Sequence, residues 1–124
     1  MDIWNAFHGD AEVRELAEAW IAQPRPDYTK TDEQLYRWLR EEPDRGLATI
    51  CAIAQLADVP ETVGLLAAGP LEDFLCLHEE KVFDTVHRLA DEHELFRVLL
   101  RGVWPLTMSK VFYQKIRALS VERL

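Results

Sequence analysis

The sequence is short of the features that mark secreted and membrane proteins: it has two cysteines, no long apolar run and no basic N-terminal segment. Two cysteines are too few for a disulfide framework, and Cys51 and Cys76 stand among apolar neighbours at helical spacing, which predicts buried free thiols. The longest weakly polar stretch, residues 47–57, is far shorter than the roughly 20 residues that a membrane-spanning helix needs. Asp2 follows Met1 directly and no apolar segment comes after it, which argues against a secretory signal. We therefore expect a cytoplasmic protein without membrane contact.

An excess of positive charge is also missing, and this argues against two classes of partner. The 124 residues include 14 Lys and Arg against 22 Asp and Glu, so the formal net charge is −8. Nucleic acids and anionic membranes carry charge of the same sign, so we expect no general affinity for either. The chain is 48% hydrophobic and 29% charged, which is typical of a folded soluble domain. We therefore predict that residues 1–124 form a single domain.

The charge is distributed unevenly along the chain. Residues 1–98 contain 21 acidic and 9 basic residues, a balance of −12. Residues 99–124 contain one acidic and five basic residues, a balance of +4. Because opposite charges attract at short range, we predict contacts between a basic last helix and acidic helices earlier in the chain.

Strand patterns are absent: no run of four or more residues alternates apolar and polar side chains between turn signals. Proline and glycine instead divide the chain into windows of helical length, in which apolar residues recur every three to four positions. These features predict an all-α fold, a single compact domain of seven or eight short helices packed as antiparallel pairs. The residues expected to cap or begin individual helices are Asp10, Thr31 with Gln34 as a capping box, Asp44, Pro60, and either Thr107 or Ser109.

The four tryptophans divide into two kinds by position. Trp20 and Trp38 belong to apolar helical stripes, which predicts core packing. Trp4 and Trp104 lie near predicted helix ends, and Trp104 directly precedes Pro105. Each of these two indoles either covers an end of the core or anchors a partner protein, because tryptophan is enriched among interface hot spots.

Patterns of catalysis and metal binding are missing. The chain has no HExxH motif and no CxxC pair, and His87 and Asp91, four residues apart, are expected to form a surface pair rather than a metal site. Residues 64–69 have the glycine spacing of a phosphate-binding loop, but they lack the Lys and Ser/Thr that must follow. We therefore predict no catalytic residue, no metal and no cofactor.

One segment, LAAGPLEDFL, stands out. Gly69 is expected to end one helix, and Pro70 to begin the next helix with Leu71. Glu72 and Asp73 then fall in the first turn, where the helix dipole favours carboxylates. The alternative is that Glu72 and Asp73 lie at an exposed elbow and bind a basic group of a partner.

LAAGPLEDFL, followed by Phe96-Arg97 and the Gly-Val-Trp at 102–104, resembles the signature of a bacterial domain-of-unknown-function family, family 6869. The pattern of this family is similar to LAxGPLEDLL, followed by His-Gly, an amphipathic helix, a Phe-Arg pair and GVW. The resemblance covers about residues 60–104 of this chain. This chain has Glu79 in place of the usual glycine, and we expect the preceding helix to continue into Lys81. The resemblance implies a bacterial, cytoplasmic, helical domain and no particular activity.

The sequence favours a non-enzymatic protein-binding module with a basic protein partner. One concrete form is an immunity or antitoxin-like protein that neutralises a basic effector. In this hypothesis the candidate binding residues are Glu72, Asp73, Trp104 and Trp4. Two alternatives remain: a self-associating structural domain, which forms a homo-oligomer, and a small enzyme that uses carboxylate and histidine chemistry.

Overall fold

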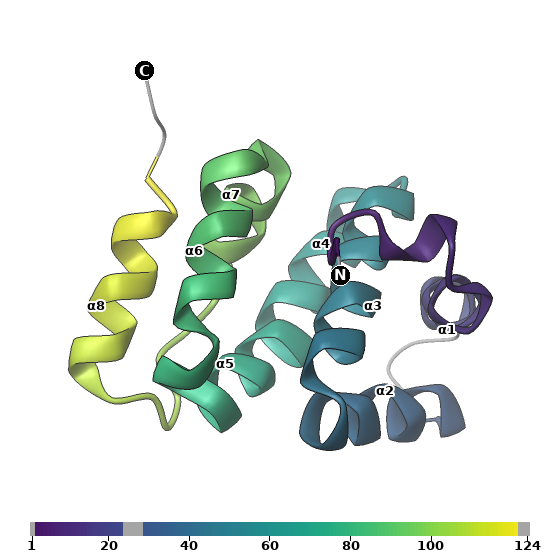
Figure 1. Ribbon diagram of the computed structural model, residues 1–124, viewed down its shortest axis with the longest axis horizontal. Coiled ribbons are helices and arrows are strands. Elements are labelled where there is room, and N and C mark those ends of the chain that lie inside the picture. Colours follow the sequence, from purple (N-terminus) through teal and green to yellow (C-terminus); the bar gives the residue numbers. More distant parts are fainter. Residues whose placement is uncertain (1, 24–28, 122–124) are drawn as a thin grey trace. The chain divides into compact units, whose positions relative to one another are not determined.

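The computed structural model describes residues 2–23 and 29–121, and every regular element in these ranges is a helix (Figure 1). This confirms the all-α prediction. The contacts divide the chain into two units, Met1–Val63 (unit 1) and Gly64–Leu124 (unit 2), and the boundary lies within helix α4 (Pro60–Leu66). The prediction of a single domain stays a prediction, and the two units are described separately. None of the helices in the described ranges is both long and apolar enough to cross a membrane.

Unit 1 is built around α3 (Pro43–Leu56), against which both α1 (Ala11–Ala22) and α2 (Lys30–Glu41) pack. A short 3-10 helix, η1 (Ala6–His8), precedes α1 and also contacts α3. Residues 46–54 of α3 are all buried, which explains why this helix is apolar nearly all round. Trp20 and Trp38 lie in the core, as predicted.

The helix starts of unit 1 agree only in part with the predicted caps. Asp10 is the N-cap of α1, as predicted, and its carboxylate accepts hydrogen bonds from the backbone N–H groups of Glu12 and Val13. The other two predictions are wrong by two residues, because the N-cap position of α2 is Thr29 and that of α3 is Glu42, whose side chain makes no capping hydrogen bond. Pro43 occupies the first position of α3, where its missing N–H leaves no hydrogen bond unmade.

A buried carboxylate joins α1 to the start of α2. Asp32 is 7% exposed and accepts a hydrogen bond at 3.0 Å from the indole Nε1 of Trp20. Its other oxygen accepts from the backbone N–H of Thr29 at 3.1 Å, which completes the capping box. These partners satisfy a group that is otherwise costly to bury.

Unit 2 contains the end of α4, a π-helical turn η2 (Ala67–Leu71), α5 (Glu72–His78), a 3-10 turn η3 (Glu79–Val82) and three further helices. These helices, α6 (Phe83–Glu92), α7 (Glu94–Leu100) and α8 (Lys110–Leu119), pack against one another pairwise. The core of unit 2 includes Leu66, Leu71, Phe74, Leu75, Val86, Phe96, Leu99, Phe112 and Ile116.

The predicted break at Gly69 and Pro70 is wrong, because the backbone stays helical through both residues. Leu66 and Leu71 have φ values of −63° and −67°, and residues 67–71 form a π-helical turn between α4 and α5. Proline inside an α-helix removes one hydrogen bond and crowds the carbonyl four residues earlier. The π-helical turn is the local rearrangement with which this helix continues past Pro70.

The expected extension of α5 into Lys81 is also wrong. The α-helix ends at His78, and Glu79, the first residue of the 3-10 turn, adopts φ 42° and ψ −117°. This conformation favours glycine, which is the usual residue here in the sequences that the segment resembles. Glu79 therefore makes the turn with a strained backbone.

The last helix is held by one cap and one ion pair. Ser109, one of the two residues predicted as alternatives, caps α8, and its Oγ accepts from the backbone N–H of Phe112 at 3.2 Å. Lys115 Nζ lies 2.8 Å from Glu80 Oε2 and 4.0 Å from the ring centroid of Phe83. This pair is an instance of the predicted attraction between the basic last helix and earlier acidic residues.

Candidate functional site

Two of the three segments that carry the family resemblance meet within unit 2. Gly102, which follows α7, lies so close to the π-helical turn that a Cβ added to it would be 2.8 Å from the Cβ of Ala67. Two residues later, the backbone N–H of Trp104 donates a hydrogen bond of 2.6 Å to Glu72 Oε1. The LAAGPLEDFL segment and the Gly-Val-Trp segment therefore form one local structure.

Glu72 lies inside this structure. It is 5% exposed, and its pKa is raised, mainly because burial disfavours the charged carboxylate. The hydrogen bond from Trp104 opposes this shift, and the negative charge of Asp73 adds to it. Asp73 is half-buried. Of these two candidate binding residues, Glu72 is therefore buried, and its carboxylate makes a hydrogen bond within unit 2.

Trp104, by contrast, presents its side chain to solvent. The residue is 68% exposed, although its backbone is fixed by Glu72. Leu106, two residues further on, is 63% exposed and has a strained φ of 40°. The Cys76 sulfur lies 3.9 Å from the carbonyl oxygen of Pro105. We call Trp104, Pro105 and Leu106 the WPL loop: an exposed, largely apolar loop on a fixed backbone.

The WPL loop belongs to the connection between α7 and α8, and Glu79 fixes the end of that connection at Ser109. Its carboxylate accepts from the Ser109 hydroxyl at 2.9 Å, and it lies 3.4 Å from the Ser109 backbone nitrogen. The strained residue Glu79 therefore holds the start of α8, while Glu72 holds the start of the loop.

The second candidate tryptophan has a different place. Trp4 is 9% exposed in unit 1, and its backbone carbonyl accepts a hydrogen bond of 2.6 Å from Gln55 Nε2. The sequence left two alternatives for each indole, covering an end of the core or contacting a partner. Trp4 covers the core, whereas Trp104 is exposed to solvent. The elbow residues Gly69, Pro70 and Leu71 lie in the π-helical turn, where Pro70 and Leu71 are buried.

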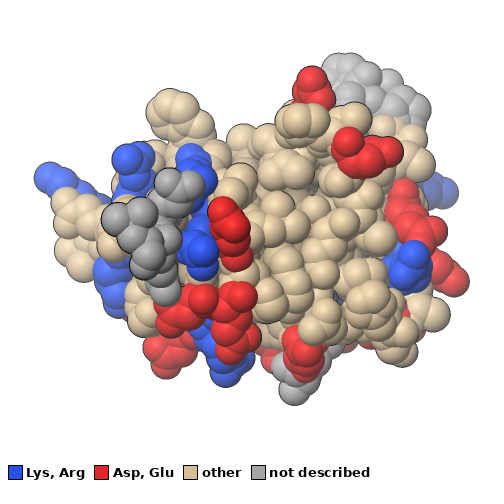
Figure 2. All heavy atoms as spheres, turned by 90° about the horizontal axis from the view of Figure 1, so that it is seen from above, with Lys and Arg blue, Asp and Glu red and all other residues tan. Residues whose placement is uncertain are grey.

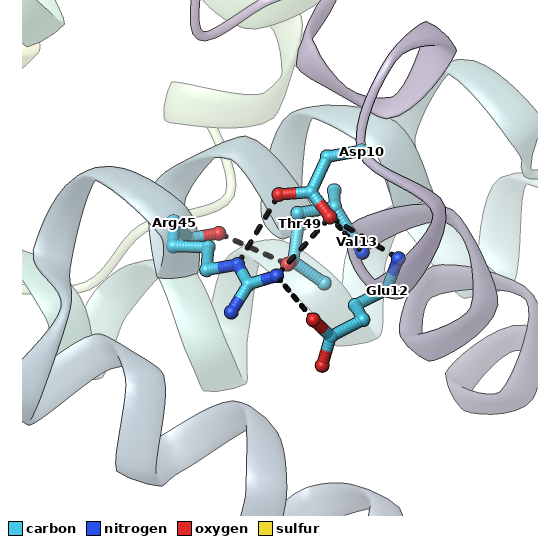
Figure 3. Close-up of polar contacts among 5 residues, drawn as sticks. All are labelled: Asp10, Glu12, Val13, Arg45 and Thr49. Carbon is cyan, nitrogen blue, oxygen red and sulfur yellow. Dashed lines mark hydrogen bonds and ion pairs between the residues drawn. The ribbon is translucent and has the colours of Figure 1, made fainter.

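Unit 1 has a polar cluster that the sequence patterns do not indicate (Figure 3). Arg45 of α3 contacts Asp10 through Nε at 3.2 Å and Nη2 at 3.1 Å, and Nη2 lies 3.0 Å from Glu12. The guanidinium also stacks over Trp38, with its carbon 4.3 Å from the ring centroid. The hydrogen bond from Arg45 lowers the pKa of Asp10. Because Arg45 is 35 residues from Asp10, no local spacing could have revealed this pair.

Two hollows flank this cluster. The first, of about 410 Å³, is lined by Asp10, Glu42, Pro43, Asp44 and Arg45. The second, of about 370 Å³, lies between α1 and α2 and is lined by Glu12, Glu15, Leu16, Ala19, Gln34 and Trp38.

The remaining reactive side chains do not converge. His87 and Asp91 form the predicted surface pair, with 3.4 Å between Nε2 and Oδ2. Cys51 is fully buried, which raises the pKa of its thiol, whereas Cys76 is half-buried rather than buried as predicted. Within residues 2–23 and 29–121, no three His, Cys, Asp or Glu side chains are grouped to hold a metal ion.

The two units differ in charge. Unit 1 carries 13 acidic and 6 basic residues, a net charge of −7, whereas unit 2 carries 9 and 8, a net charge of −1. On the face of unit 2 seen in Figure 2, Lys and Arg side chains gather over the region of α8, with Asp and Glu side chains beside them. Exposed acidic residues of unit 1 without an ion-pair partner in the described ranges are Glu15, Glu33, Glu41, Glu42, Asp44, Asp58 and Glu61. The exposed basic residues of unit 1 that have no ion-pair partner in the described ranges are Lys30, Arg37 and Arg40. Unpaired acidic residues therefore outnumber unpaired basic residues on this unit.

Comparison with known proteins assigns the chain to a family without a known activity. A family model described as a family of unknown function (DUF6869) matches residues 21–124, and the chain belongs to this family. The match includes all three resemblance segments and most of unit 1. Neither the curated proteins nor the solved structures that were searched gave a match.

Proposed function

We propose that this protein is a non-enzymatic protein-binding module of the bacterial cytoplasm, and that the WPL loop is its contact surface. The observation that carries the proposal is Trp104, whose side chain is 68% exposed while its backbone N–H is held by a buried carboxylate. A solvent-exposed indole leaves a large apolar surface in water, and burying that surface against another protein is favourable. An exposed tryptophan on a fixed backbone is therefore suited to contact a partner.

The fixed backbone increases the benefit of such a contact. Ordering a loop on binding reduces affinity, whereas a loop that is already ordered avoids this loss. Glu72 and Gly102 hold the beginning of the connection, and Glu79 holds its end at Ser109. A partner would therefore meet Trp104 and Leu106 in a defined position.

Charge supports a basic protein as the partner. Unit 1 has a net charge of −7, with seven exposed carboxylates that have no ion-pair partner among the described residues. Complementary charge speeds the encounter of two proteins and disfavours acidic competitors. A concrete form of the proposal is an immunity or antitoxin-like protein that occludes a basic effector, such as a nucleic-acid-degrading toxin.

The test is affinity capture from the native host with three forms of the chain: wild type, Trp104→Ala and Val98→Ala. Val98 is an exposed apolar residue of α7 and serves as the matched control. We expect a basic protein to be captured by wild type and by Val98→Ala. With the purified partner, Trp104→Ala should weaken binding by at least about tenfold, as for an interface hot spot.

Two outcomes would overturn the proposal. One is a partner that binds wild type and Trp104→Ala equally well. The other is a stable wild-type dimer in sedimentation that Trp104→Ala dissociates, because the WPL loop would then serve self-association.

A further inference from the structure

The groove between α1 and α2 in unit 1 is built on regular helical spacing. Glu12, Glu15, Leu16 and Ala19 of α1 are separated by three, one and three residues, so they share one face of the helix. Gln34 and Trp38 of α2 are four residues apart and line the opposite side. Leu16, Ala19 and Trp38 supply apolar surface, while the two glutamates supply charge.

Arg45 links this groove to the neighbouring hollow. Arg45 lines the hollow with Asp10, and it contacts Glu12 and Trp38, which both line the groove. Together the two linings contain five carboxylates and one guanidinium. Asp10 and Glu12 bind that guanidinium, and the remaining three carboxylates, those of Glu15, Glu42 and Asp44, have no ion-pair partner in the described parts of the chain.

We propose that this groove binds a short basic segment of the partner protein, with one apolar side chain seated against Leu16 and Trp38. Lys or Arg side chains on either side of it would lie beside Glu15 and, in the adjoining hollow, beside Glu42 and Asp44. The inference rests on the proposed binding function and names a second contact surface for it, independent of the WPL loop.

Size and charge both favour this occupant. The groove volume of about 370 Å³ is at the small end of ligand pockets, which suits one large side chain and its neighbours. The internal Arg45 already shows the preferred chemistry, because its guanidinium lies between two carboxylates and over an indole face. An acidic segment would meet uncompensated like charge at the same place.

The test is an NMR titration of the ¹⁵N-labelled full chain with the peptide acetyl-Lys-Arg-Leu-Phe-Lys-Arg-amide at low ionic strength. We expect saturable shifts confined to α1, α2 and the start of α3. A peptide with Glu in place of the basic residues, and one with Ser in place of Leu and Phe, should give no saturable shifts.

Two pairs of variants locate the contact. Ala19→Gln fills the groove without changing charge and should abolish saturable binding, whereas Ala118→Gln on the exposed side of α8 should leave it unchanged. Glu15→Lys should weaken binding about threefold to tenfold, beyond the effect of Glu61→Lys, which changes the net charge equally from α4.

Shifts outside unit 1, or equal weakening by Glu15→Lys and Glu61→Lys, would overturn the groove proposal. The partner captured through Trp104 separates the two proposals. If this partner binds the Ala19→Gln variant and wild type with equal affinity, the groove inference fails and the proposed function stands. If the peptide occupies the groove but Trp104→Ala has no effect on the partner, the groove stands and the role of the WPL loop fails.

Discussion

The Glu72 carboxylate accepts a 2.6 Å hydrogen bond from the backbone N–H of Trp104, a residue 32 positions further along the chain. The buried member of this pair lies in the LAAGPLEDFL segment, and the exposed member lies in the Gly-Val-Trp segment. The relationship explains why an acidic residue occurs in the core of unit 2. It also explains how a tryptophan in a loop keeps a fixed position.

Removing the Glu72 carboxylate should destabilise unit 2. We expect Glu72→Ala to lower the free energy of unfolding by about 2–3 kcal/mol, because the Trp104 N–H loses its acceptor and the side chain leaves space behind. Glu72→Gln retains a carbonyl acceptor and should cost less. Urea unfolding measures both values, and equal stability of Glu72→Ala and wild type would contradict the assigned role.

Acidification should favour Glu72 in the folded state. Burial raises the pKa of this carboxyl above its ordinary value of 4.5, so the folded chain binds the proton more tightly than the unfolded chain. The contribution of Glu72 to stability therefore increases as the pH falls through the raised pKa toward 4.5, and it is constant below that. Relative to Glu72→Gln, wild type should gain stability between pH 7 and pH 4.5 in urea unfolding. A constant difference across this range would contradict the raised pKa.

The strain at Glu79 can be measured with two variants that both lack the carboxylate. Glu79→Gly and Glu79→Ala each lose the hydrogen bonds to Ser109, but only glycine relieves the backbone at φ 42° and ψ −117°. We expect Glu79→Gly to be more stable than Glu79→Ala by about 1 kcal/mol or more in chemical unfolding. Equal stabilities would show that this turn is unstrained.

Gly102 should not tolerate a side chain. A Cβ at this position would lie 2.8 Å from the Cβ of Ala67, so Gly102→Ala should cost about 1–3 kcal/mol through crowding. The matched control is Gly64→Ala in α4, where an added Cβ meets no atom within 4 Å. That variant should gain about 0.5–1 kcal/mol, because alanine is the better helix former. Thermal unfolding of the two variants distinguishes crowding from helix propensity, and opposite signs are expected.

Asp10 has two roles that substitutions can separate. It caps α1, and it binds Arg45 of α3. Asp10→Ala removes both interactions and should cost about 1–2 kcal/mol, whereas Asp10→Ser keeps a capping oxygen and should cost less. Because Arg45 lowers the pKa of Asp10, the stabilisation of wild type over Asp10→Ser should persist above about pH 3.8 and decline as the pH falls through the lowered value. Urea unfolding at pH 7 and pH 3 tests this prediction, which is wrong if the difference is independent of pH.

Much of the fold could be predicted because its signals are local. Apolar side chains every three to four residues gave the helical class, and Asp10, Pro60 and Ser109 gave the starts of three helices. The error at Gly69 and Pro70 occurred where tertiary packing overrides a local signal. Pro70 reads as a helix start, yet packing of the flanking segments keeps the chain helical through a π-helical turn.

The candidate site was predictable in composition but not in arrangement. The sequence patterns point to Glu72 and Trp104 and leave open whether each faces the core or a partner. The patterns do not indicate Arg45, because its partners Asp10 and Glu12 are distant in the sequence. They also allow an exposed elbow at Glu72, which is buried in the structure.

By itself, the sequence determined the helical class, the acidic charge and the membership of the chain in a family, because composition, periodicity and motif spacing are properties of neighbouring residues. Only the tertiary structure decided which of two tryptophans is exposed and which carboxylates are occupied. Those outcomes depend on contacts between residues far apart in the chain, such as Glu72 with Trp104 and Asp10 with Arg45. Burial and hydrogen bonding at such contacts are fixed by how the helices pack, and no local pattern encodes them.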